Sequence, residues 1–383
     1  MNCENLVLWH SLQAEPVACR VAIAGDFLPA GRLMAPQIRD WDDMAQCLED
    51  YFRDVSLTFA NLEACLATDG LTPRRLCGIG EIVSAPESCL DYLMALRSQA
   101  VGMANNHSYD FGQAGVFRTR EAILSRGMVP IGAGHTLAGP PETFVWQGPG
   151  PVRVGFWAAA KATLQPANAK MPGVEPARQT RARQALESLR SQGAQTLIAL
   201  IHAGCLRTNR PDPEDVHCLD SIAQCGFDVV VACHSHRLSG YRETNGASVR
   251  PSFCFYGVGS VVSGYACTPE EREGLIVVAG LNLAGELVRV EVRPVVLDRS
   301  GFGTVPAPPA AQMVLDRFRG LSAEIADGSY EYAFYDDMSQ GLLQLYIRDA
   351  KTAFRQSGIR GLARKLRRIR VRHLRRVVHK AIG

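Results

Sequence analysis

The chain has 383 residues, of which 47% are hydrophobic, so it can bury a full core as one large domain or two of ordinary size. This composition excludes a disordered chain. The formal charge of +3 conceals an asymmetry, because residues 351–383 carry twelve Lys or Arg and no acid, leaving 29 basic against 38 acidic residues upstream. The acidic body argues against a broad nucleic-acid surface, and the basic tail predicts an appendage for an anionic partner.

The cysteines and the N-terminal residues indicate the cellular compartment in which the protein is expected. Twelve cysteines occur without a Cys-x-x-Cys pair, and Cys19, Cys65, Cys233 and Cys254 fall in or beside predicted strands, where small hydrophobic residues belong. The first residues lack the positive region and the long apolar region of a signal peptide. No apolar stretch reaches the roughly 18 residues of a membrane span. We therefore expect a reduced, cytoplasmic protein.

Six short apolar runs, rich in β-branched residues, each lead into a polar group. They are 17–24, 55–60, 100–104, 196–201, 228–232 and 252–256. Runs of this length are typical of buried strands, and in layered α/β folds ligand sites form where such strands end. We expect the six strands to converge on one site.

Segments with helical spacing alternate with these strands, which predicts an α/β class. The predicted helices are 41–52, 86–99, 113–126, 176–192 and 212–225. Farther on, 274–281 and 287–297 follow one another around a turn at 283–286, which favours an antiparallel hairpin. A purely parallel, doubly wound sheet is therefore not expected.

The C-terminal part changes character at residues 301–311, where Gly and Pro interrupt both periods. We predict a main domain over 1–300, a Pro-rich linker with a helical segment over 301–350, and a basic tail over 351–383. Within the tail, 361–380 places apolar residues on one face of a helix and arginines on the rest.

The polar groups at the strand ends are the kinds of side chain that divalent metals bind. Carboxylate, imidazole and amide ligands are available from Asp26, Glu63, Asn106, His202, His234 and His236. A two-metal site of this kind can activate water for phosphoryl or related transfer. His107 suits proton donation to a leaving group, and Asp110 could orient it.

Each element taken alone has a simpler explanation. A Gly-Asp pair is more often a turn, and the Asn-Asn-His segment could cap the helix that starts near Gln113. A single His202 is more often structural, and Cys205 and Cys233 are more often buried fillers. Together and in this order, the groups favour a metal site. Nucleotide-binding loops and a Gly-x-Ser-x-Gly elbow do not occur.

These residues resemble the CapA-like proteins of poly-γ-glutamate and capsule synthesis, within the calcineurin-like metallophosphoesterase superfamily, over about residues 17–300. The resemblance rests on Gly25-Asp26 with Arg32, Asn61-Leu62-Glu63 with Thr68, Ala104-Asn105-Asn106-His107 with Asp110 and Gly112, His202-Ala203-Gly204, and His234-Ser235-His236. The sequence departs from the family pattern at Cys233, where glycine is usual, at Cys205-Leu206, and at Gly259-Ser260-Val261.

The resemblance implies a four-layer α/β/β/α sandwich, with the basic helical extension appended, and two divalent ions, Mn, Zn or Fe. It implies one ion on Asp26, Glu63 and His236, and another on Glu63, Asn106, His202 and His234, with His107, Asp110 and Arg32 as catalytic residues.

Two kinds of function remain open from the sequence. The first is a metal-dependent hydrolase that cleaves a phosphoester or related bond in the synthesis of a capsule or poly-γ-glutamate type polymer. The alternative is a non-catalytic assembly or polymer-binding protein that docks to polymer or membrane through residues 351–383. The tail could equally be a solvated helix, and nucleic acid is not an expected partner.

Overall fold

The computed structural model describes residues 5–11, 15–34, 40–74, 82–161, 165–206, 208–245 and 251–338. The chain divides into two compact units, residues 1–326 and 327–383. The predicted tail at 351–383 and its helix at 361–380 lie outside the described residues. None of the helices within the described ranges combines the length and apolar character that a bilayer crossing requires.

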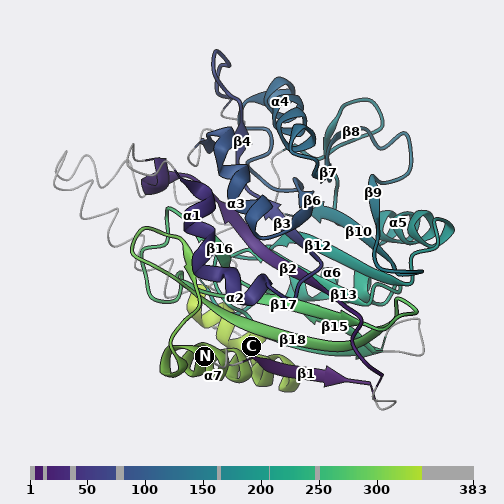
Figure 1. Ribbon diagram of the computed structural model, residues 1–383, viewed down its shortest axis with the longest axis vertical. Coiled ribbons are helices and arrows are strands. Elements are labelled where there is room, and N and C mark those ends of the chain that lie inside the picture. Colours follow the sequence, from purple (N-terminus) through teal and green to yellow (C-terminus); the bar gives the residue numbers. More distant parts are fainter. Residues whose placement is uncertain are drawn as a thin grey trace, which may run out of the picture. The chain divides into compact units, whose positions relative to one another are not determined.

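The first sheet has nine strands within the described residues, in the order β1-β18-β17-β2-β3-β6-β7, with β16 beside β2 and β19 beside β18. Their bounds are β1 Leu6–His10, β2 Cys19–Leu28, β3 Leu57–Leu62, β6 Ser98–Gly102, β7 Val129–Ile131, β16 Ser260–Ser263, β17 Glu273–Leu281, β18 Leu287–Leu297 and β19 Gly303–Thr304. Strands β2, β3, β6, β7 and β16 run parallel, whereas β17, β18 and β1 are antiparallel to their neighbours. The predicted hairpin is thus confirmed as β17 and β18 (Figure 1).

The second sheet has six strands in the described ranges, in the order β14-β15-β13-β12-β10-β9. Their bounds are β9 Thr143–Gln147, β10 Arg153–Ala160, β12 Thr196–Ala203, β13 Val229–His234, β14 Tyr241–Asn245 and β15 Pro251–Phe255. The four central strands are parallel and the two edge strands antiparallel. Two small pairs complete the strands: β4 Cys65–Leu66 with β5 Ser84–Ala85, and β8 Ala133–His135 with β11 Gly173–Val174.

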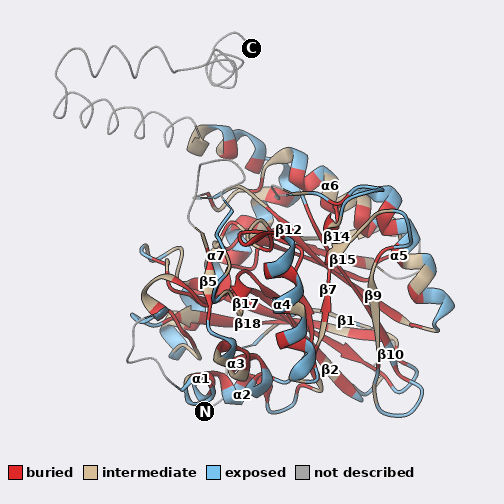
Figure 2. Ribbon diagram, turned by 90° about the horizontal axis from the view of Figure 1, so that it is seen from above, coloured by how far each residue is buried: buried red, intermediate tan, exposed pale blue. Residues whose placement is uncertain are grey.

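The two sheets pack face to face through apolar side chains. The rings of Phe59 on β3 and Phe156 on β10 lie 5.1 Å apart, edge to face, and Trp9 on β1 lies 5.5 Å from Phe253 on β15. Buried residues accordingly dominate both sheets in Figure 2. Because each sheet offers one face to the other, its second face needs helices to exclude water.

The helices cover the outer faces of the two sheets. They are α1 Trp41–Ala45, α2 Glu49–Phe52, α3 Leu90–Ala95, α4 Gly112–Ser125, α5 Gln179–Ser191, α6 Pro213–Ala223 and α7 Pro308–Asp327, with short 3-10 turns at η1 Gly31–Met34, η2 Gln46–Leu48 and η3 Glu87–Cys89. Helices α3 and α4 pack on β6 and β7, whereas α5 and α6 pack on β9, β10, β13 and β15. The result is the predicted four-layer α/β/β/α arrangement.

Three predicted elements need correction, two in where they end and one in its continuity. The helix predicted at 86–99 stops at Ala95, because Arg97 takes a positive φ of 60° and Ser98 already begins β6. The segment 41–52 is broken into α1, η2 and α2. Strand β2 continues past Asp26 to Leu28, because β16 pairs with it there and supplies the hydrogen bonds that an extended backbone needs.

Helix α7 begins inside the Gly- and Pro-rich segment that we predicted as a boundary. Pro308 and Pro309 open the helix, where a proline costs no hydrogen bond. The ring of Phe318 on α7 stacks 5.5 Å from Tyr241 on β14, and Arg210 forms an ion pair with Glu324 of the helix. This helix therefore packs against the second sheet.

Candidate metal centre

Strand register brings the predicted ligands to one edge of the two sheets. In the first sheet Asp26 on β2 pairs with Asn61 on β3 and with Ser260 on β16. In the second sheet His202 on β12 pairs with Cys233 on β13. These parallel strands end on the same side, so polar residues that are far apart in sequence meet there.

The ligand atoms form three overlapping clusters, and within each cluster they lie within 4.8 Å of one another. The clusters are Asp26–Glu63–His236, Glu63–His202–His234 and Asp26–His202–Cys233. The first two correspond to the two ligand sets that the family resemblance implies. Asn106 joins the second, because its Oδ1 lies 2.6 Å from His202 Nε2. All six predicted metal ligands are thus gathered in one place.

Asp26 is the most heavily bonded of these side chains. Its Oδ2 accepts a 2.8 Å hydrogen bond from the backbone N–H of His234, and its Oδ1 accepts a 2.7 Å bond from Asn61 Nδ2. Burial alone raises the pKa of Asp26, but the neighbouring His202 and His236 outweigh burial and hold that pKa well below its usual range. Asp26 is therefore an anion at neutral pH.

Glu63 lies between the histidines but is poorly bonded. Its Oε1 is 3.5 Å from His202 Nε2, and its Oε2 is 3.7 Å from His236 Nε2. Burial and the negative charge of Asp26 together raise the pKa of Glu63 well above its usual range. Two buried carboxylates this close cannot both ionise without a cation nearby.

Burial in the same centre shifts the pKa values of the three histidines in different directions. Burial lowers the pKa of His202, and burial with the neighbouring imidazoles lowers the pKa of His234 further. Burial also acts to lower the pKa of His236, but Glu63 and Asp26 outweigh it and raise that pKa to about 9. Neutral His202 and His234 are in the form that binds metals.

The residues present fit a divalent cation. Within the described part of the chain, Glu63 Oε2 and His234 Nδ1 are buried and have no hydrogen-bond partner. Buried polar atoms without hydrogen bonds are costly, and a bound cation can satisfy such atoms. The donor set of carboxylate, imidazole and amide oxygen is one that Zn²⁺, Mn²⁺ and Fe²⁺ accept. His234 and His236 also take positive φ values of 127° and 54°, which mark a backbone held in an unusual conformation.

His107 stands beside the centre on the loop that precedes α4. Its Nδ1 donates a 2.7 Å hydrogen bond to Asp110 Oδ2, and its Nε2 lies 4.0 Å from Glu63 Oε1. Asp110 also accepts a 2.7 Å bond from the backbone N–H of Val83, which fixes the carboxylate. The pair therefore presents one imidazole nitrogen toward the metal ligands.

Arg32 makes its contacts elsewhere. Its guanidinium donates to the backbone carbonyl oxygens of Ser300 at 2.9 Å, Gly264 at 3.1 Å and Ser263 at 3.5 Å. These bonds connect η1 to the end of β16 and to the turn before β19. In this position Arg32 supports the loops that flank the centre, and its predicted catalytic role stays a prediction.

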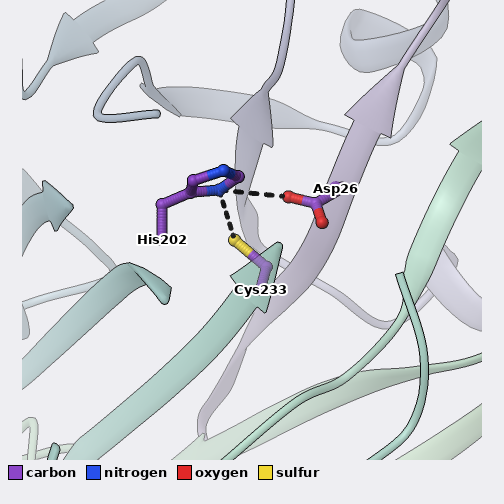
Figure 3. Close-up of side chains that lie close together, drawn as sticks. All are labelled: Asp26, His202 and Cys233. Atoms are coloured by element: carbon purple, nitrogen blue, oxygen red, sulfur yellow. Dashed lines mark hydrogen bonds and ion pairs between the residues drawn. The ribbon is translucent and has the colours of Figure 1, made fainter. Parts of the chain in front are cut away.

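Sequence reasoning missed several residues that organise the centre. Asn105 donates to Asn61 Oδ1 at 3.1 Å and to the Leu62 carbonyl at 2.8 Å, which ties the Asn-Asn-His loop to β3. Ser260 Oγ lies 3.1 Å from His236 Nδ1. Cys233, predicted as a filler, has its sulfur 3.6 Å from His202 Nδ1 (Figure 3). The only sequence feature that pointed to Cys233 as a residue of the centre was its position next to His234.

Solved structures that resemble this fold include two nucleotidases and a phosphoesterase. They include the Haemophilus influenzae NAD nucleotidase NadN, with 13% identity, a TM-score of 0.42 and coverage of 79% of this chain and 56% of that one. The 5'-nucleotidase precursor from Thermus thermophilus has 13% identity, a TM-score of 0.46 and coverage of 80% and 59%. The calcineurin-like phosphoesterase YfkN from Bacillus subtilis has 12% identity, a TM-score of 0.41 and coverage of 84% and 99%.

This chain spans less than two thirds of the length of either nucleotidase. A search of curated proteins gave no significant match. The sequence profile described as bacterial capsule synthesis protein PGA_cap matches residues 20–265, a range that contains every metal ligand predicted above. Because this match covers well over half of the chain, the protein belongs to the bacterial capsule synthesis family PGA_cap.

Proposed function

We propose that the protein is a metal-dependent hydrolase that cleaves a phosphoester or related bond during synthesis of a capsule or poly-γ-glutamate type anionic polymer. The observation that carries the proposal is that Glu63 Oε2 and His234 Nδ1, from two residues of the Glu63–His202–His234 cluster, are buried without a hydrogen-bond partner. Leaving both atoms without a partner is costly, and a bound cation would remove that cost.

The residues have distinct roles in this proposal. Asp26, Glu63 and His236 would hold one ion, and Glu63, Asn106, His202 and His234 the other. The ions would supply a hydroxide nucleophile at neutral pH and neutralise charge on the scissile group. Asn105 keeps the loop of Asn106 and His107 in register with β3.

His107 is the proton donor in this proposal. Because Nδ1 donates to Asp110, the second nitrogen is free to carry a proton to the leaving oxygen. The side chain is 19% exposed, so part of the imidazole is open to solvent. The Asp110 carboxylate holds the ring orientation and stabilises the protonated imidazole, as the carboxylate does in other histidine-based sites.

The test compares the wild type with His234→Ala, using His217→Ala on the exposed face of α6 as the matched control. Protein purified without chelator is analysed for metal content, folding and hydrolysis of bis(p-nitrophenyl) phosphate and γ-glutamyl peptides. We expect bound transition metal and hydrolysis in the wild type and the control, and loss of both in folded His234→Ala. No bound metal, even after addition of Mn²⁺ or Zn²⁺, would overturn the proposal and favour a polymer-binding role.

The proposal has two further parts. Residues 351–383 contact a membrane or an anionic polymer, and the protein is located in the cytoplasm. The twelve basic residues of this segment, without an acid, support attraction to an anionic surface. A salt-sensitive affinity for anionic vesicles that disappears when residues 351–383 are deleted is the expected result.

A further inference from the structure

The third ligand cluster, made by Asp26 Oδ1, His202 Nδ1 and Cys233 Sγ, is not explained by the two ligand sets of the proposed function. All three side chains are buried, with 0% exposure for Asp26 and 1% for His202 and Cys233. His202 Nδ1 lies 3.6 Å from Cys233 Sγ and 3.6 Å from Asp26 Oδ1. Figure 3 shows one nitrogen of the imidazole in contact with both the Asp26 carboxylate and the Cys233 sulfur.

These separations match the edges of a tetrahedral metal site. A sulfur at about 2.3 Å and a nitrogen at about 2.0 Å from one zinc ion stand about 3.5 Å apart at the tetrahedral angle. The observed 3.6 Å between Nδ1 and Sγ agrees with that value. The sulfur and the imidazole nitrogen are therefore at a separation that one zinc ion can bridge, and the three ligand atoms of the cluster lie within 4.8 Å of one another.

The tautomer of His202 also suits a ligand on this side. Its Nε2 faces the Asn106 Oδ1 acceptor at 2.6 Å and so carries the hydrogen, which leaves the lone pair on Nδ1. That lone pair and Asp26 Oδ1 both point at the amide nitrogen of Asn61, at 3.3 Å and 2.7 Å. Two acceptors that converge on one donor group can converge equally on a cation that displaces it.

We propose that Asp26, His202 and Cys233 form a thiolate-containing site for one thiophilic divalent ion such as Zn²⁺. This site, called the thiol site below, goes beyond the two ligand clusters of the proposed function but rests on the same centre binding metal. Binding replaces the hydrogen on Cys233 Sγ with the metal bond, and the proton leaves to solvent. Sulfur favours Zn²⁺, Co²⁺ and Cd²⁺ over Mn²⁺, which prefers oxygen ligands.

The thiol site shares His202 with the Glu63–His202–His234 cluster. A neutral imidazole has one lone pair, so His202 binds an ion through Nδ1 or through Nε2, but not through both. An ion in the thiol site therefore takes the imidazole away from the cluster that contains Glu63. Thiophilic ions and oxygen-preferring ions are expected to occupy different positions in this protein.

The test is the optical spectrum of the full chain loaded with Co²⁺ after removal of metal by chelator. A thiolate ligand gives Co²⁺ an intense near-ultraviolet charge-transfer band, whereas carboxylate and imidazole ligands give only weak visible bands. We expect the band in the wild type, its loss in Cys233→Ala, and its retention in Cys205→Ala and Cys254→Ala. Cys205 lies on the neighbouring loop and Cys254 on strand β15, so both control for other sulfurs.

A competition titration with Zn²⁺ gives a second readout. Loss of a direct ligand in Cys233→Ala should weaken Zn²⁺ binding by more than the roughly 10- to 100-fold that loss of an outer partner costs. Wild-type protein that binds Co²⁺ with visible bands but without the near-ultraviolet band would overturn the thiol site and leave the proposed function standing. Failure of the wild type to bind any ion would overturn both.

Discussion

A buried ion pair at the start of α5 offers a direct test of how the fold holds the rim of the metal centre. Arg181 donates from Nε to Glu175 Oε1 at 2.7 Å and from Nη2 to Oε2 at 2.9 Å, and His135 Nε2 lies 2.7 Å from the same carboxylate. The backbone carbonyl of Glu175 accepts from Ala160, which pairs with His202 across β10 and β12. The pair thus lies one strand away from a metal ligand.

Replacement of Glu175 by alanine should cost about 3–5 kcal/mol of the free energy of unfolding, because it leaves a buried guanidinium without its counter-charge. The Glu175 side chain is 0% exposed and that of Arg181 is 8% exposed, so water has little access to the ion pair. In Glu175→Ala, Arg181 keeps only the Gly139 carbonyl and Gln184 Oε1 as acceptors.

The assay is urea unfolding at pH 7 of Glu175→Ala, the double variant Glu175→Leu/Arg181→Met, and Glu187→Ala on the exposed face of α5. The double variant should recover most of the loss, because it removes both buried charges and keeps the volume. The surface control should lie within about 0.5 kcal/mol of the wild type. A cost below about 1 kcal/mol for Glu175→Ala would refute the reasoning that this pair is closed to water.

The same carboxylate predicts a pH effect: burial acts to raise the pKa of Glu175, but Arg181 and His135 outweigh it and lower that pKa. Its stabilisation is therefore complete above the unfolded pKa of about 4.3 and is lost as pH falls through the folded value, so unfolding curves of the wild type and Glu175→Gln should converge in acid. His107→Ala should lower kcat on an active substrate by about 10²- to 10⁴-fold with metal content unchanged. Gly25→Ala should destabilise the fold by about 1–3 kcal/mol or more in thermal unfolding, because the added Cβ would meet the Gly259 carbonyl oxygen.

Much of the fold could be predicted because its strands are short, fully buried and rich in β-branched residues. Strands β3, β12, β13 and β15 lie within a few residues of the predicted runs. The end of the helix at 86–99 could not be predicted, since Arg97 accepts a left-handed conformation that only tertiary packing stabilises. The extension of β2 past Asp26 depends on β16, more than 230 residues later, which no local pattern reveals.

The meeting of the candidate metal ligands was predictable for a different reason: their chemical types follow successive strands, and parallel strands end on the same side. Asn61 and Asn105 were not predicted as organisers, because their importance lies in hydrogen bonds between loops that only the register defines. Cys233 was not predicted as a site residue, because buried cysteine in a strand is ordinary. Its distance from His202 comes from the pairing of β12 with β13.

The electrostatics of the centre are those expected of a group of side chains that binds a cation. Without an ion, burial and the neighbouring charges lower the pKa of Asp26 but raise that of Glu63, and they raise the pKa of His236 while those of His202 and His234 are lowered. Burying so many titratable groups together is unfavourable unless a bound ligand offsets the free energy of their desolvation. A bound divalent ion allows both carboxylates to ionise, gives Glu63 Oε2 and His234 Nδ1 a partner, and removes the need for a charged His236. The mismatch among these protein groups therefore supports metal binding at this centre.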